Sequence, residues 1–168
     1  MDEVISAVAY LHGEKILHRD IKPENIVMSL GVPKLCDFGW AAFDDTLMHH
    51  TFCGTLDYVS PEMKDLGRYN HSIDIWSIGV LTFELLAGFP PFKQEISSWK
   101  LKGAKRGTKW SWDVLYPPQI EGQAKEFIEG ILQVDPLQRM TLSACKSHSF
   151  LTSHQQHTQS EEDFSYLF

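Results

Sequence analysis

One stretch of eight residues, 18–25, constrains this sequence most; it reads His-Arg-Asp-Ile-Lys-Pro-Glu-Asn. Asp20 supplies a carboxylate that can accept a hydroxyl proton, and Lys22 supplies a positive charge that can neutralise phosphate. Asn25 carries a side-chain oxygen that can bind Mg²⁺, and Asp37, twelve residues further on, offers a second one. These residue types at this spacing predict a catalytic loop for phosphoryl transfer.

The residues after this loop predict a small β-hairpin. Two β-prone runs, 26–28 and 34–36, flank a segment that contains Gly31 and Pro33. Such a hairpin holds the residues just before and just after it at matching ends. The two metal-binding oxygens are therefore expected to converge on one site.

Helices are predicted for most of the remaining chain. Apolar residues recur at helical spacing over 4–12, and Gly13 is placed to end that helix. Residues 72–87 are apolar on nearly every face, which predicts a helix buried at the centre and stopped by Gly88. The other predicted helices are short: one that opens at Ser60-Pro61-Glu62 with Ser60 as its cap, and three at 95–102, 124–133 and 142–148.

Composition excludes several classes of protein. A chain of 168 residues with 43% hydrophobic content can bury one core, and a net charge of −7 argues against a general nucleic-acid or anionic-membrane binder. The basic residues within 100–109 are interpreted as solvated surface. Cys36, Cys53 and Cys145 lack metal-type spacing, so we expect free thiols in a reducing compartment and no zinc site.

Three short motifs, in order, resemble the signature set of the eukaryotic protein kinases. They are residues 18–20 with Asn25, residues 37–39 (Asp-Phe-Gly) and residues 60–62 (Ser-Pro-Glu). Lys-Pro-Glu-Asn at 22–25 resembles the serine/threonine branch. Two further stretches are most similar to the Aurora kinases: Asp-Phe-Gly-Trp at 37–40, and Cys-Gly-Thr-Leu-Asp-Tyr at 53–58 followed by Pro-Glu-Met. The resemblance runs from Met1 to about Leu151.

This resemblance implies a mainly α fold, the C-terminal lobe of a protein kinase with a small β-hairpin at the catalytic site. Residues 1–151 are then a partial kinase domain, and residues 152–168 are a polar, acidic tail that we expect to be disordered. The Gly-rich loop, the strand lysine and its helix glutamate partner of a kinase N-terminal lobe do not occur in the sequence. The N-terminal lobe is thus expected to be absent from these 168 residues.

The resemblance also implies a role for particular residues. The catalytic group is Asp20 as proton acceptor, Lys22 as stabiliser of the transferring phosphoryl group, and Thr55, which orients both. ATP is expected to be held by Lys22, Glu24, Asn25 and Asp37, with Mg²⁺ on Asn25 and Asp37.

Five further residues are given regulatory or structural roles by the same resemblance. Thr51 aligns with an activating phosphorylation site within an activation segment at 40–58, and Arg19 is its expected partner. Asp74 is expected to accept backbone hydrogen bonds from the catalytic loop, and Arg139 to pair with Glu62.

The function implied is transfer of the ATP γ-phosphate to a protein serine or threonine, in an Aurora-like cell-cycle role. Partners are then protein substrates and an activating protein, with no nucleic acid or membrane, in the nucleus or cytoplasm and, by resemblance, at the spindle or centrosome. Three alternatives stay open: a fragment of an active kinase, an inactive binding module that recruits substrates or competes with a full kinase, and a lobe that pairs with a separate small lobe. The 168 residues alone are expected to be very weakly active.

Overall fold

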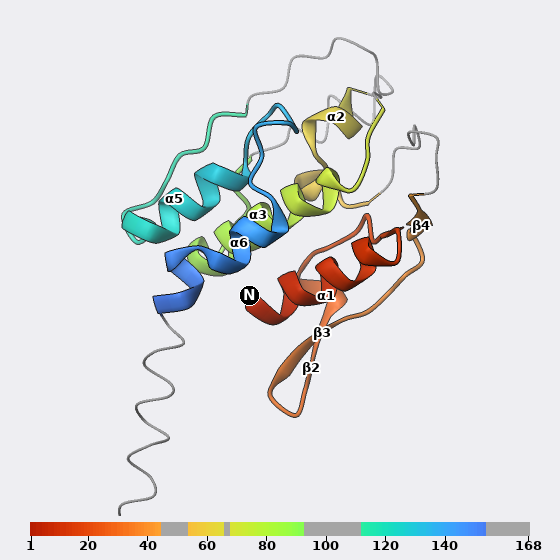
Figure 1. The fold of residues 1–168 in the computed structure, drawn as a ribbon. Coiled ribbons are helices and arrows are strands. Elements are labelled where there is room, and N and C mark those ends of the chain that lie inside the picture. The colour runs from red at the N-terminus through yellow and green to blue at the C-terminus, as the bar shows by residue number, and fades with distance from the viewer. Residues whose placement is uncertain (45–53, 66–67, 93–111, 154–168) are drawn as a thin grey trace, which may run out of the picture.

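The computed structural model describes residues 1–44, 54–65, 68–92 and 112–153 of the chain. Helices form its body, and two small antiparallel sheets lie beside the first helix (Figure 1). The elements in chain order are α1 (Asp2–Gly13), β1 (Ile16–Leu17), η1 (Pro23–Asn25), β2 (Ile26–Ser29), β3 (Val32–Leu35), β4 (Ala42–Phe43), η2 (Leu56–Tyr58), α2 (Pro61–Lys64), α3 (Ser72–Ala87), α5 (Gly122–Ile131) and α6 (Leu142–Ser147), where η denotes a turn of 3₁₀ helix.

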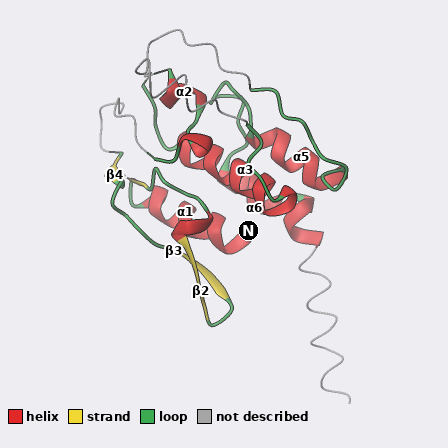
Figure 2. Cartoon of the chain, turned by 180° about the vertical axis from the view of Figure 1, so that it is seen from behind, coloured by secondary structure: helices red, strands yellow, loops and turns green. Residues whose placement is uncertain are grey.

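The helix α3 lies at the centre of the fold, as its apolar faces predict. Every residue from Ser72 to Phe83 is buried, and α1, α5 and α6 surround the helix in both views (Figures 1 and 2). At Gly79 an added Cβ would lie 2.5 Å from the Ile131 side chain, so the glycine permits the close approach of α5. Gly88 ends α3 with a left-handed φ of 83°, which confirms the predicted stop.

The first helix ends at Gly13, as predicted, but the glycine is not in the left-handed conformation. α1 includes Gly13, its C-cap is Glu14, and the residue in the left-handed conformation is Lys15, with φ of 57°. The peptide N–H of Lys15 donates to the carbonyl of His12. The helix therefore stops at the predicted residue, and the left-handed residue in the turn into β1 lies two positions later, at Lys15.

The predicted hairpin is confirmed, with its second strand shifted. Ile26 pairs with Leu35 and Ser29 with Val32, and the two turn residues between them have φ of 51° and 79°. The strand predicted over 34–36 begins earlier, at Val32, because this edge strand tolerates a proline. The second sheet, β1 with β4, was not predicted, since two-residue strands carry no periodicity.

Other boundaries differ by one or two residues. Ser60 does occupy the N-cap of α2, but its side chain makes no capping hydrogen bond, contrary to the prediction. α5 begins and ends two residues before the predicted 124–133, and α6 ends at Ser147. Residues 149–153 are helical, so helix continues past the predicted start of the tail at 152. The helix predicted at 95–102, the basic stretch 100–109, Cys53 and the tail from 154 lie outside the described residues.

Two further findings bear on the composition analysis. Cys36 and Cys145 are free thiols in the described part of the chain, and burial raises the pKa of Cys145 to about 12. Among the helices of the described residues, none combines the length and the apolar character that crossing a membrane requires.

Lys64, the last residue of α2, is buried at 2% exposure. Its ammonium nitrogen lies 4.8 Å from the centroid of the Trp112 ring, a cation–π distance. Burial lowers the pKa of Lys64 to about 7, and the negative charge of Asp57 offsets only part of this effect. Burial also raises the pKa of Asp57, and the positive charge of Lys64 opposes this rise without cancelling it.

The lowered pKa of Lys64 predicts a pH-dependent stability. Between about pH 7 and 10.5 the unfolded chain keeps the lysine proton and the folded chain does not, so the free energy of unfolding should rise with pH. Lys64→Met should reduce this slope, as measured by urea denaturation at pH 7, 8, 9 and 10. Lys125→Met, at a half-exposed lysine, is the control. Equal slopes in parent and Lys64→Met would contradict the prediction.

Candidate active site

The backbone of the catalytic loop is shaped by a buried carboxylate on α3. Asp74, fully buried, accepts hydrogen bonds from the peptide N–H of His18 on Oδ2 (2.9 Å) and of Arg19 on Oδ1 (2.8 Å). Arg19 has a left-handed φ of 67°, a conformation that a non-glycine residue adopts only when its surroundings hold it there. The contacts are those that the resemblance implies for Asp74.

Asp20 lies at the centre of a network of hydrogen bonds and is 4% exposed. Its Oδ2 is 2.9 Å from Lys22 Nζ and accepts a hydrogen bond from Asn25 Nδ2 at 2.9 Å. Its Oδ1 accepts from both the peptide N–H and the hydroxyl of Thr55, each at 3.1 Å. Three other predicted site residues, Lys22, Asn25 and Thr55, are thus brought together around the Asp20 carboxylate.

Two opposing effects determine the pKa of Asp20. Burial alone would raise it, but the hydrogen bond and charge of Lys22, with the hydrogen bonds from Thr55 and Asn25, lower it below 3.8 in total. The carboxylate is therefore ionised at neutral pH and can accept a hydrogen bond from a substrate hydroxyl.

Thr55 reaches Asp20 because the chain before it packs directly on the catalytic loop. Gly54 has φ of 87°, and a Cβ there would lie 2.7 Å from the carbonyl oxygen of Arg19, so no other residue fits without displacement. Lys22 Nζ also donates to Thr55 Oγ1 at 2.7 Å. Thr55 therefore links the position of this segment to the positions of the Asp20 and Lys22 side chains.

Asn25 and Asp37 flank the β2–β3 hairpin. The peptide N–H of Cys36 donates to the carbonyl of Asn25 at 2.9 Å. Cys36 therefore lies opposite Asn25, and Asp37 is the next residue along the chain. Asn25 uses Nδ2 on Asp20, which leaves Oδ1 for a cation. The Asp37 side chain is exposed, with a left-handed φ of 59°, and Oδ1 accepts a hydrogen bond from the Gly39 N–H at 3.1 Å.

This donor set fits Mg²⁺ bound together with phosphates, because it offers few protein oxygens and no sulfur or imidazole. Glu24, also predicted at the nucleotide, lies exposed in η1 beside Asn25. Within the described ranges, no group of three or more His, Cys, Asp or Glu side chains could hold a metal ion by itself.

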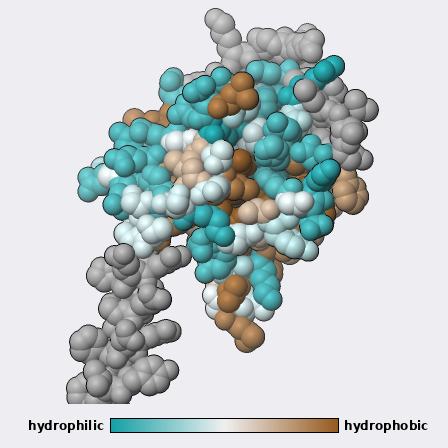
Figure 3. All heavy atoms as spheres, viewed as in Figure 1, coloured by the Kyte–Doolittle hydropathy of each residue, from teal (hydrophilic) through white to brown (hydrophobic). Residues whose placement is uncertain are grey.

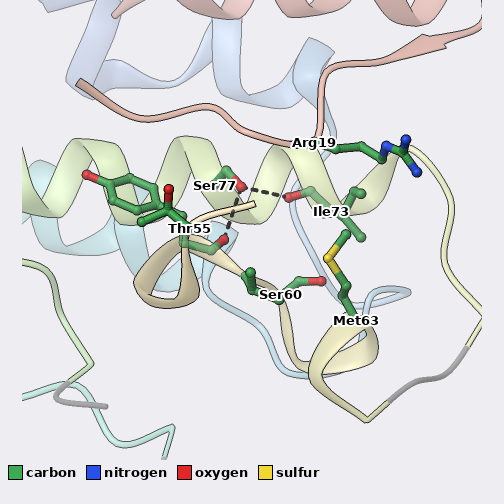
Figure 4. A pocket seen from close by; sticks show the side chains of 8 residues that line it. Arg19, Thr55, Ser60, Met63, Ile73 and Ser77 are labelled. Atoms are coloured by element: carbon green, nitrogen blue, oxygen red, sulfur yellow. Dashed lines mark hydrogen bonds between the residues drawn. The ribbon is translucent and has the colours of Figure 1, made fainter. Parts of the chain in front are cut away.

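The Arg19 side chain extends away from Asp20. Its Nε donates to the Trp40 carbonyl, and Nη1 donates to the Tyr69 hydroxyl at 3.2 Å. Its predicted partner, Thr51, lies outside the described residues. Arg19 also borders a small pocket that continues between α2 and α3 (Figure 4), where its neighbours include Ser60, Met63, Ile73 and Ser77.

Ser77 joins the end of the activation segment to α3. Its Oγ lies 3.1 Å from the Tyr58 carbonyl and 3.2 Å from the Ile73 carbonyl, the two contacts drawn as dashed lines in Figure 4. Ser77 was not among the predicted site residues. Its position within an otherwise apolar helix could have pointed to this role, because a buried hydroxyl needs a hydrogen-bond partner.

The second implied pair, Glu62 with Arg139, forms a buried ion pair. Arg139 Nη1 donates to Oε1 at 2.8 Å and Nη2 to Oε2 at 3.1 Å, with the side chains 1% and 10% exposed. The guanidinium also donates to the carbonyls of Ser72 (2.8 Å) and Gln133 (3.0 and 3.2 Å). Arg139 thereby joins the start of α2, the start of α3 and the end of α5.

A buried carboxylate that contacts a lysine, a threonine and an asparagine, together with an aspartate just after the β2–β3 hairpin, is the arrangement that the resemblance to protein kinases implies. A family model described as the protein kinase domain matches residues 1–151. The chain belongs to the protein kinase family, and the predicted family is confirmed.

Within that family the chain is related to the Aurora kinases. It is 37% identical over 155 residues to Aurora kinase C of Mus musculus, and the match covers 92% of this chain and 54% of that protein. It is 40% identical over 151 residues to the Aurora kinase of Saccharomyces cerevisiae, covering 89% of this chain and 40% of the relative. It is 38% identical over 152 residues to Aurora kinase B of Mus musculus, and the match covers 90% of this chain and 43% of that protein. The chain therefore spans about half the length, or less, of these relatives.

Proposed function

We propose that this chain is the C-terminal lobe of a serine/threonine protein kinase that transfers the γ-phosphate of ATP to a protein hydroxyl. The arrangement of Lys22, Thr55 and Asn25 around the buried, ionised Asp20 is the observation that supports the proposal most directly. Phosphoryl transfer depends on positioning and charge stabilisation more than on covalent chemistry, and this cluster supplies both.

Each residue has a distinct task in the proposed reaction. Asp20 accepts or orients the proton of the attacking hydroxyl, and Lys22 neutralises charge on the transferring group. Asn25 and Asp37 would hold Mg²⁺, and the charge of the bound ion would stabilise the phosphates. Thr55 holds the Asp20 and Lys22 side chains in position relative to each other, and Glu24 places its backbone near the nucleotide.

The exposed surface of the hairpin supports the assignment to a C-terminal lobe. Apolar side chains gather at the hairpin tip in Figure 3, and the exposed ones are Val27 (48%), Met28 (67%), Leu30 (101%) and Val32 (45%). A cluster of this kind on a monomer marks a contact surface. We assign it to the small lobe that carries the glycine-rich loop and the strand lysine, the parts that grip ATP.

Regulation, cellular role and partners follow from the Aurora relatives. Phosphorylation of Thr51 would offer Arg19 a doubly charged partner close to the catalytic loop. A cell-cycle function, protein substrates, an activating protein, and a nuclear, cytoplasmic or spindle location are proposed for this chain on the same basis.

A chimaera tests the proposed function. The N-terminal part of the yeast Aurora kinase that this chain does not match is placed before Met1, and transfer from radiolabelled ATP to a serine-containing peptide is measured. We expect transfer by the chimaera and little or none by the 168 residues alone. A folded chimaera that binds ATP and transfers no phosphate would overturn the proposal and favour a binding module.

A further inference from the structure

An apolar groove lies at the end of α3 opposite to Asp74, the residue that contacts the catalytic loop. The groove has a volume of about 670 Å³ and is lined by residues 89–92, which follow α3, and by five of the residues 113–118. Aromatic rings, prolines and Leu115, which is 87% exposed, make up most of the lining. Asp113 is the one charged residue among the lining residues that the structure describes. Its size and apolar character are typical of a binding site.

The walls of the groove are anchored to the core of the fold. The rings of Phe89 and Tyr116, one from each side of the groove, both pack on the fully buried Phe83 of α3, with centroids 5.9 and 5.8 Å apart. Phe92, 3% exposed, stacks on Trp76 of the same helix at 5.3 Å. Because both sides are held by one buried helix, the groove is formed before anything binds to it.

The described part of the chain ends beside this groove. Ser153, the last described residue, donates from Oγ to Oε1 of Gln123, in the first turn of α5, at 3.3 Å. Gln123 is five residues after Pro118, which lines the groove, so their Cα atoms are at most about 18 Å apart. Ten extended residues, 154–163, span up to about 35 Å. Residues from 164 onward can therefore reach the groove.

The sequence changes character at the point where it can reach the groove. Residues 154–163 contain no aliphatic, phenylalanine, tyrosine or tryptophan side chain, whereas residues 164–168 read Phe-Ser-Tyr-Leu-Phe. Burial of such large apolar side chains against aromatic and proline walls is favourable. The chain thus supplies both a tether of sufficient length and a segment whose chemistry matches the groove.

Charges near the groove favour one path for the tether. Lys125, 45% exposed, lies over the ring of Tyr116, with Nζ 5.3 Å from the centroid. It stands on the route from the start of α5 to the groove, which the acidic residues 161–163 would follow. Asp113 in the groove and Glu129, 3.7 Å from Lys125, repel the same acidic residues. Apolar burial must therefore supply most of the affinity.

We propose that residues 164–168 bind back into the groove between residues 89–92 and 113–118, with the acidic residues 161–163 beside Lys125. A short tether holds such a segment near its site at an effective concentration of about a millimolar, so even a weak contact is formed for much of the time. The proposal concerns a surface at the far end of α3 from Asp74 and does not depend on kinase activity. Its failure is therefore separable from failure of the proposed function.

Amide nuclear magnetic resonance spectra of the full 168-residue chain provide the first test. A variant with Phe164→Ser, Leu167→Ser and Phe168→Ser should shift the signal of Leu115 in the groove. The signal of Leu137, equally exposed at 89% but beyond the other end of α5, should not move. In the reciprocal experiment, Leu115→Asp should shift the signals of residues 164–168, and the matched control Leu137→Asp should leave them in place. Unchanged signals in both folded variants would overturn the proposal.

A peptide of residues 154–168 provides the second test. Added to the triple-serine variant, it should bind with a Kd of about a millimolar or less, and to the parent chain several-fold more weakly, because the groove of the parent is already occupied. The parent signals should be the same at low and at high protein concentration. Concentration-dependent signals would assign the groove to a second copy of the chain. Equal binding of the peptide to both chains, or binding to neither, would show that the tail does not occupy the groove, and each of these three results would overturn the proposal.

Discussion

Asp20→Asn is expected to lower the rate of phosphoryl transfer by the chimaera by about a hundredfold to ten-thousandfold, the usual contribution of a positioned general base. The substitution keeps the size of the side chain but removes its ability to accept a proton. It also leaves Lys22, 2.9 Å away, without its carboxylate partner in a site where Asp20 is 4% exposed. Both changes act on the two side chains that the proposed mechanism places at the reacting atoms.

Initial rates at saturating ATP, with the melting temperature of each variant, provide the measurement. Asp135→Asn is the matched control, because that carboxylate caps an exposed turn through the Leu137 N–H and contacts no residue of the site. The control should transfer phosphate at the parental rate. A folded Asp20→Asn chimaera with parental activity would exclude Asp20 as the proton acceptor and, with it, the proposed mechanism.

The same contacts determine how Asp20 contributes to stability. Its pKa is lowered in the folded chain, so the stabilisation is present above about pH 4, the ordinary range for an aspartate. It is lost as the pH falls through the folded-state pKa. Asp20 therefore keeps its negative charge above pH 5. A loss of activity above that pH would have to come from other groups, and histidines are the side chains that change charge there.

Arg139→Met is expected to lower the free energy of unfolding by about 3–5 kcal/mol, the cost of leaving a buried charge without its partner. Glu62, 10% exposed, would keep its carboxylate but lose both bonds to the guanidinium. The carbonyls of Ser72 and Gln133 would lose donors at the same time. Such a loss is a large part of the stability of a domain of this size.

Urea denaturation of the parent, Arg139→Met, Glu62→Leu and the double variant measures this effect and the coupling between the two residues. The double variant should lose less stability than the sum of the single losses, because neither charge is then left alone. The exposed Lys125–Glu129 pair, 3.7 Å apart, provides the control, and Lys125→Met should cost less than about 0.5 kcal/mol. Equal costs at the two pairs would show that burial of the Arg139 pair is unimportant.

Local patterns were sufficient for much of the fold. The apolar faces of residues 72–87 predicted the buried central helix, and the turn residues between two β-prone runs predicted the hairpin. Helix ends were less accurate at α5, which begins and ends two residues before the prediction. At the end of α1 the predicted stop is correct, but the left-handed residue is Lys15 and not Gly13. The two-residue pairing of β1 with β4 depends on contacts between distant segments and leaves no periodic signal.

The order and spacing of residues 18–25 and 37–39 predicted the family, which the comparisons confirm, and indicated the proposed chemistry, because hydroxyl deprotonation and magnesium binding need particular side chains within a short stretch of chain. Tertiary structure alone decided that Asp20 is buried yet ionised, since its lowered pKa depends on Thr55, thirty-five residues away, as well as on Lys22 and Asn25. It also placed His12, His71 and Asp44 in one row with Asp74. These contacts join the end of α1, the start of α3 and the residue after β4, which are far apart in the chain, and no local sequence pattern encodes them.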